Sequence, residues 1–135
     1  MKDTIADGLT SSMKLTVDRD RTIDFMGEKA RVYATPMLVR DVEIACRELL
    51  LEHLDAGEDS VGTRVDIEHL AATPLGMMVE IHVTVMSVEG RSVGFRVEAH
   101  DGLDVVCRGQ HQRFVVDVAK TAARLADKVA KAGLA

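Results

Sequence analysis

The sequence contains no tryptophan and few other aromatic residues. Its 135 residues include one tyrosine and three phenylalanines, so it offers no series of aromatic rings on which nucleic-acid bases could stack. The formal net charge is −5, and no basic block is present that could neutralise a run of phosphates. We therefore expect no nucleic acid among the partners of this protein.

Cysteine is also scarce, and long apolar runs are missing. Cys46 and Cys107 lie far apart and form no CxxC pair, so neither a disulfide framework nor a zinc site is expected. No apolar run approaches the roughly 20 residues of a membrane-spanning helix, and the N-terminal segment lacks the apolar part of a signal peptide. P-loop, GxGxxG and GxSxG motifs are absent too. These absences predict a cytoplasmic protein with reduced thiols and no membrane association.

One long helix is predicted in the first half of the chain. Hydrophobic residues make up 47% of the sequence, which is enough for the core of a single domain over residues 1–135. Residues 1–12 are expected to form a loose leader. The helix is predicted to have Thr35 as its N-cap and Pro36 at its first helical position, and to end near Gly57.

Strand-like segments surround this helix. A short alternating segment begins at Met13, and Thr22–Met26 is a second short candidate. Four longer strands are predicted at residues 61–70, 77–88, 92–100 and 105–117. The turns between them are too short for parallel crossovers, so the sheet is expected to be antiparallel. A weakly amphipathic helix over 119–132 follows. The pattern predicts an α+β fold, with a long helix wrapped by a curved sheet of five to six strands.

An acidic residue stands on the apolar side of the long helix. At about 100° per residue, Glu43 falls between Leu50 and Leu54. The other charged residues are expected on the opposite side; these are Arg40, Asp41, Arg47, Glu48 and Glu52. Burying a carboxylate is unfavourable unless it is paired. Two interpretations stay open: Glu43 serves chemistry in a site, or it lies at the edge of the apolar arc and pairs with Arg47 one turn later.

The strand-like segment 61–69 carries a histidine on its apolar face. The residues expected on that face are Val61, Thr63, Val65, Ile67 and His69. A histidine that faces a core needs a hydrogen-bond partner, so His69 is either a structural histidine bonded to backbone or part of a site. Thr35 and Glu43 lie about 12 Å apart along the helix. They can share one reaction only if the substrate spans the gap or a second subunit contributes.

The remaining histidines show no metal-ligand spacing. His53, His82, His100 and His111 are expected in solvated or structural roles, with His82 and His100 on the polar faces of their strands. Arg113, in GQHQRFVVD, lies where the apolar phase of its strand changes, which indicates a bulge. Such an arginine could meet phosphate or a subunit partner, although a surface ion pair is the more common arrangement.

Four segments together resemble the hot-dog-fold thioesterases related to fluoroacetyl-CoA thioesterase. They are YATPMLVRDVE, VGTRVDIEHLAATPLGMMVEI, SVEGRSVGFRVEAHDG and GQHQRFVVD, which follow the family's order and spacing over roughly residues 13–118. The resemblance implies a hot-dog fold and a homodimer, with a tetramer as an alternative assembly. It also implies active sites at the subunit interface that cleave acyl-CoA thioesters.

The same resemblance implies a catalytic group of Thr35, Glu43 and His69. Gly62 matches a glycine near the thioester, and Arg113 matches an arginine of the family's HxRxVV motif. We expect Glu43 to act as general base or nucleophile, assisted by His69 and Thr35, without a metal or other cofactor. The Gly62 amide would support the oxyanion.

Alternative functions belong to other classes. A non-catalytic binding module would hold acyl-CoA without cleaving it. Hydratases and dehydratases share the hot-dog fold, but their histidine and acid lie in a different, helix-borne arrangement. The segment TIDFMGEKARVYATP is shorter and less aromatic than the lid segment of the fluoroacetyl-specific enzyme, which argues against fluoroacetate as the acyl group.

Overall fold

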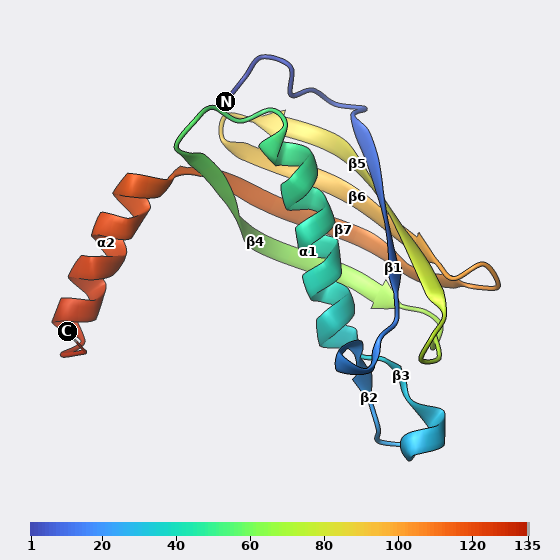
Figure 1. Cartoon of the computed structure of the whole chain (residues 1–135). Helices are drawn as coiled ribbons and strands as arrows, with labels where there is room; N and C mark the ends of the chain where they lie inside the picture. Colours follow the sequence, from blue (N-terminus) through green and yellow to red (C-terminus); the bar gives the residue numbers. More distant parts are fainter. Residues whose placement is uncertain (135) are drawn as a thin grey trace.

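The segments with period-two alternation form one five-stranded antiparallel sheet (Figure 1). The computed structural model describes residues 1–134. In their order across the sheet, the strands are β1 (Thr10–Thr16), β5 (Met78–Glu89), β6 (Ser92–His100), β7 (Val105–Asp117) and β4 (Glu58–His69). Every neighbouring pair is antiparallel, as predicted. Strand β4 therefore forms one edge of this sheet.

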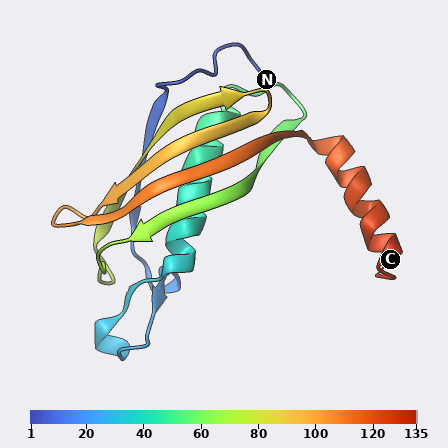
Figure 2. The ribbon, with the colours of Figure 1, turned by 180° about the vertical axis from the view of Figure 1, so that it is seen from behind.

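Helix α1 (Thr35–Leu51) packs across one face of the sheet, and the other face carries no helix in the described part of the chain (Figure 2). The core between them is almost entirely aliphatic. It includes Leu38, Val42 and Leu49 from α1 and Ile81, Val83 and Val97 from the sheet. A long helix wrapped by a curved antiparallel sheet is the hot-dog arrangement, so this prediction is confirmed.

Three further elements lie outside this layer. Strands β2 (Thr22–Ile23) and β3 (Val32–Tyr33) form a small separate sheet beside the N-terminus of α1. Helix α2 (Val118–Lys131) begins and ends one residue earlier than predicted, and no residue in it is buried. It extends away from the sheet (Figure 1). Within residues 1–134, no helix is both long and apolar enough to span a membrane.

The N-terminal segment is more ordered than predicted. Strand β1 begins at Thr10, inside the segment 1–12 that was expected to be a loose leader. The Lys2 amide donates to the carbonyl of His53, and the Gly8 amide donates to the carbonyl of Val85, each over 2.8 Å. These backbone hydrogen bonds fix the segment to the end of α1 and to β5. The candidate strand Thr22–Met26 is correspondingly shortened to the two residues of β2.

Both predicted ends of α1 are wrong. Ala34, not Thr35, is the N-cap: it has extended backbone angles, and its carbonyl accepts from the amides of Met37 and Leu38. No side chain caps this end. The helix stops at Leu51 instead of near Gly57. Gly57 has a φ of +83°, a conformation that favours glycine, and it belongs to the turn into β4.

A bulge in β4 changes which residues face the core. The pairing with β7 shifts register between Gly62 and Arg64, so the extra residue lies in β4. The bulge predicted at Arg113 therefore lies in the neighbouring strand. Val61, predicted to face inward, pairs with Phe114 on the outer face and is 44% exposed. Beyond the bulge, Val65, Ile67 and His69 pair with His111, Gly109 and Cys107 on the helix-facing side, as predicted.

Candidate active site

The N-terminus of α1 and the end of β4 bring two predicted site residues into contact. Thr35 Oγ1 lies 2.7 Å from His69 Nδ1. The threonine hydroxyl can make this hydrogen bond because Ala34, one residue earlier, occupies the cap position. The His69 ring also packs edge-on against Tyr33, with 6.4 Å between ring centroids. The Thr35–His69 pair is thus formed within one chain.

The second ring nitrogen of His69 is buried and unbonded. Nε2 has no hydrogen-bond partner among the described residues. Burial lowers the pKa of His69, while the backbone of Ala71 acts in the opposite direction, so the ring is neutral at pH 7. A surface hollow beside the ring is lined partly by Ile23, Val32 and Leu70. His69 thus has a side-chain partner in Thr35 besides its backbone contact with Ala71, so its assignment to a site stays a prediction.

Glu43 lies two turns further along α1 and faces β4 at Gly62. A Cβ placed on Gly62 would lie 2.3 Å from Glu43 Oε1, so only glycine allows the carboxylate to approach the strand so closely. Oε1 is also 3.7 Å from Nη1 of Arg113. The alternative pairing of Glu43 with Arg47 does not form, because Arg47 Nη2 bonds Asp59 Oδ2 over 2.7 Å.

Arg113 places a buried cation beside Glu43. Its side chain is 6% exposed, so the expected surface ion pair is wrong. Nε donates to the hydroxyl of Ser60 over 2.7 Å, and Nη2 donates to the Ser60 carbonyl over 2.8 Å. Burial lowers the pKa of this guanidinium, and the charge of Glu43 opposes that effect. The hydrogen bonds fix the guanidinium rigidly and leave Nη1 directed towards the glutamate.

His111 completes this polar group. Its Nδ1 lies 2.7 Å from the carbonyl of Arg64, and its Nε2 lies 3.1 Å from Arg113 Nη1. These partners require a proton on Nδ1 and a lone pair on Nε2. Burial lowers the pKa of His111 and keeps the ring neutral, with the charge of Arg113 acting in the same direction. The sequence prediction of a structural role fits this contact, but it missed the link to Arg113.

A buried aspartate bonds Tyr33, the residue whose ring packs against His69. Asp41, predicted on the exposed side of α1, is fully buried. It accepts hydrogen bonds from Tyr33 Oη over 2.5 Å and from Arg21 Nε over 2.9 Å. On the helical wheel Asp41 lies only about 40° from Ala45, which belongs to the apolar arc, and this proximity could have indicated that Asp41 is buried. Its contacts join α1 to the segment that carries Tyr33, the ring packed on His69.

The two thiols are poor candidates for a nucleophile. Cys46 and Cys107 are both fully buried. Burial raises the pKa of the Cys46 thiol to about 12 and that of Cys107 to about 11. Both therefore stay protonated at neutral pH, and a thiol is a far weaker nucleophile than a thiolate.

The predicted site residues form two groups, not one. Thr35 and His69 meet at the beginning of α1, and Glu43, Gly62 and Arg113 meet near its middle. The helical rise separates Thr35 from Glu43 by about 12 Å. No hydrogen bond or ion pair within residues 1–134 joins the two groups directly.

Comparison with known proteins places this geometry in a family. The family model described as fluoroacetyl-CoA-specific thioesterase matches residues 17–119. The chain belongs to this family. Within it, the fluoroacetyl-CoA thioesterase of Streptantibioticus cattleyicolor is 40% identical over 101 residues, which are 75% of this chain and 73% of that protein.

Solved structures agree with membership of the fluoroacetyl-CoA-specific thioesterase family. A structure of fluoroacetyl-CoA thioesterase matches with a TM-score of 0.87 and 33% identity, over 93% of this chain and 98% of that one. A Thermus thermophilus hypothetical protein, described as a thioesterase superfamily member, matches with a TM-score of 0.89 and 29% identity, over 98% and 99% of the two chains. The chain is an acyl-CoA thioesterase, as the sequence resemblance implied.

Proposed function

We propose that this thioesterase hydrolyses an acyl-CoA to a carboxylic acid and free CoA, with Glu43 as the general base. The observation that carries the proposal is the state of His69. Its Nδ1 is held by Thr35, while its Nε2 is buried and unbonded beside a partly apolar hollow. A buried ring nitrogen without a partner is unfavourable unless a ligand supplies one. The thioester carbonyl is such a partner.

The proposed reaction divides the chemistry between the two groups. Glu43 is 41% exposed, so water can reach its carboxylate. The carboxylate takes a proton from water as the oxygen attacks the thioester carbonyl carbon. The C–S bond then breaks as Glu43 returns this proton to the departing CoA sulfur. When Nδ1 of His69 accepts the Thr35 hydroxyl hydrogen, Nε2–H can donate to the carbonyl oxygen, and the Gly62 amide is a second candidate donor.

We further propose a homodimer in which β4 of one chain pairs with β4 of the other. This 12-residue strand is an unprotected sheet edge, and Val61 and Val65 are 44% and 38% exposed. Two copies related by a two-fold axis must pair antiparallel along this edge. With the axis at Asp66, and one extra residue in each strand at the bulge, His69 of one chain lies beside Gly62 of its partner. The Thr35–His69 pair of one subunit then faces the Glu43 group of the other.

A panel of acyl-CoA thioesters tests the reaction. The panel runs from acetyl through long-chain and aryl groups, with each thioester also offered on an acyl-carrier protein, and thiol release is measured beside binding. We expect catalytic release of CoA from at least one member, with an apolar acyl group in the hollow that Ile23, Val32 and Leu70 line. Tight binding without thiol release would support the non-catalytic binding module instead.

Mixed dimers test the division of the site between subunits. We expect Glu43→Gln and His69→Asn each to lose activity as homodimers. When the two variants are coexpressed, half of the dimers are mixed, and a shared site predicts one intact site in each, or about a quarter of wild-type activity. A site contained within one chain predicts no recovery. Light scattering on the wild type separates the dimer from the alternative tetramer.

Two further features of the proposal are testable in the same preparations. We propose that hydrolysis needs no resident metal or cofactor, so prolonged dialysis against a chelator leaves kcat/KM unchanged. Loss of turnover that a divalent metal restores would contradict this. The cytoplasmic location stays a prediction, and fractionation of cells that express the native chain tests it.

A further inference from the structure

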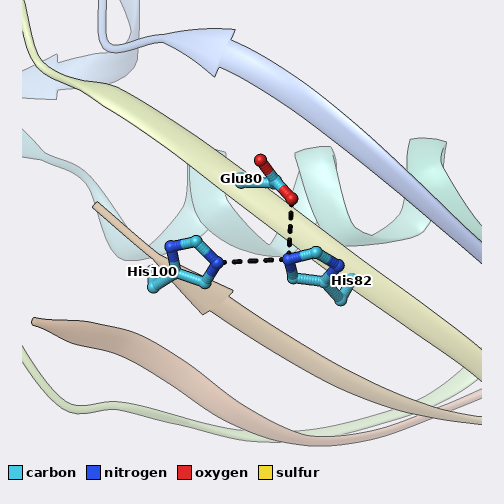
Figure 3. A group of neighbouring side chains, drawn as sticks. All are labelled: Glu80, His82 and His100. Atoms are coloured by element: carbon cyan, nitrogen blue, oxygen red, sulfur yellow. Dashed lines mark hydrogen bonds and ion pairs between the residues drawn. The ribbon is translucent and has the colours of Figure 1, made fainter. Parts of the chain in front are cut away.

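A histidine-rich cluster lies on the sheet face opposite α1. Glu80 and His82 are two residues apart on β5, and His100 ends β6 (Figure 3). Glu80 pairs directly with His100 across the two strands. Sequence spacing could not reveal this cluster, because the antiparallel register brings together residues that are 18 to 20 positions apart.

The polar atoms of these three side chains converge on one point. His82 Nε2 lies 2.8 Å from Glu80 Oε1 and 3.1 Å from His100 Nε2. The two rings stack with 5.2 Å between centroids. One potential ligand atom from each side chain lies within 4.8 Å of the other two. The side chains therefore present two imidazole nitrogens and one carboxylate oxygen to a common position.

Hydrogen bonds among these three side chains alone cannot satisfy all the facing atoms. A neutral imidazole carries one N–H, and the Nε2 atom of His82 can direct one hydrogen to only one partner. If that hydrogen points to Glu80, the Nε2 atom of His100 faces His82 without a complementary group. A single cation, in contrast, accepts lone pairs from all three atoms at once.

We propose that Glu80, His82 and His100 bind a divalent zinc ion. Neutral imidazole and carboxylate are ordinary zinc ligands, and tetrahedral coordination at about 2.05 Å separates neighbouring ligand atoms by about 3.3 Å. The observed 3.1 Å between the imidazole nitrogens is close to this value. Three protein ligands leave a fourth position for water. Such an ion would link β5 to β6 on the face opposite the proposed active site.

The surroundings of the cluster are compatible with a cation. His82 is 46% exposed, so an ion can reach it from solvent. Glu98 pairs with His82 across the strands, and Asp101 lines the adjoining hollow with Glu80 and His100. Two cationic side chains oppose these charges. Arg96 lines a second hollow with His82 and Glu98, and Lys14 Nζ lies 3.7 Å from Glu80 Oε2; the Lys14 side chain is 67% exposed, so it can move away.

Calorimetric titration of the tag-free, metal-free chain with zinc chloride tests the proposal. We expect one zinc ion per chain, a melting temperature that rises with zinc concentration, and no comparable effect of magnesium, which prefers oxygen ligands. His82→Asn and His100→Asn should each weaken zinc binding at least about tenfold, and Glu80→Gln should weaken it as well. The matched control is His53→Asn, which removes a half-buried histidine bonded to Thr4 and should leave zinc affinity unchanged.

The result that overturns the proposal is equally specific. Absence of saturable zinc binding to the wild type would reject the site. Wild-type affinity in both His82→Asn and His100→Asn would reject these ligands, and one zinc ion per two chains would reject a site within a single chain. Circular dichroism and melting of each variant without zinc show whether it is folded, so a folding defect is not mistaken for loss of a ligand.

Discussion

Gly62→Ala perturbs the candidate site through a single methyl group. The new Cβ would lie 2.3 Å from Glu43 Oε1, 3.2 Å from His111 Cε1 and 3.4 Å from Arg113 Nη1. His111 and Arg113 are held by hydrogen bonds, whereas the Glu43 carboxylate is the half-exposed end of a flexible side chain. The largest displacement therefore falls to Glu43, and His111 must shift by only a few tenths of an ångström.

The expected loss of activity follows from the size of that displacement. Oε1 must move from 2.3 Å to the 3.4 Å at which ordinary contact begins, which is a shift of about 1.1 Å. A misplacement of about 1 Å in a catalytic group can reduce the rate about 10²-fold. We expect kcat to fall by about this factor, with a small change in KM. Stability should change by less than about 1 kcal/mol, because alanine also restricts the unfolded chain.

The assay combines thiol release on the best acyl-CoA with urea unfolding. The matched control is Gly94→Ala, where the new Cβ would lie 2.6 Å from the Ser87 hydroxyl, outside the candidate site. We expect this control to keep wild-type kcat. A folded Gly62→Ala enzyme with wild-type kcat, or equal losses in both variants, would refute the proposed role of the Glu43 position.

Three further predictions follow from the contacts around the site. Thr35→Ala should lower kcat while Thr35→Ser retains most of it, because only serine can replace the hydrogen bond to His69; equal activities in thiol release would count against this role. Asp41→Ala should lower the free energy of unfolding by about 2 kcal/mol, since it leaves the buried Tyr33 hydroxyl without its acceptor and removes one of the two carboxylates that pair with Arg21, which keeps Asp18; urea unfolding measures this loss, and a change below about 1 kcal/mol would contradict it. Burial lowers the pKa values of His69 and His111, so below pH 6.5 the unfolded state binds more protons than the native state. Stability should therefore be nearly constant from pH 8 to 7 and fall from about pH 6.5 to 5.5, with a smaller fall in folded His69→Asn; a flat wild-type profile would contradict the direction of these shifts.

The strands whose apolar and polar residues alternate regularly could be predicted from the sequence. Alternation gave the positions of β5, β6 and β7 within a residue or two, because each has one face on an aliphatic core. In β4 the same rule failed before the bulge, since one extra residue moved Gly62 inward and Val61 outward. A single sequence does not show which of two paired strands carries such a bulge.

The contacts of the candidate site depend on residues that are far apart in the sequence. Thr35 looked like a helix cap, but its hydroxyl bonds His69, which is 34 positions away. Asp41 looked solvent-exposed because Tyr33 and Arg21, its partners, belong to separate short elements. The sequence placed both residues on the predicted helix, but their roles depend on tertiary contacts that a single sequence does not show.

The Glu43→Gln variant tests the proposed chemistry most directly. Glutamine keeps the shape of the side chain but is a very weak base, so we expect kcat on the best acyl-CoA to fall about 10²–10⁴-fold. Substrate binding, melting temperature and oligomeric state should stay close to those of the wild type. Near-normal thiol release by this folded variant would contradict the assignment of Glu43 as the general base.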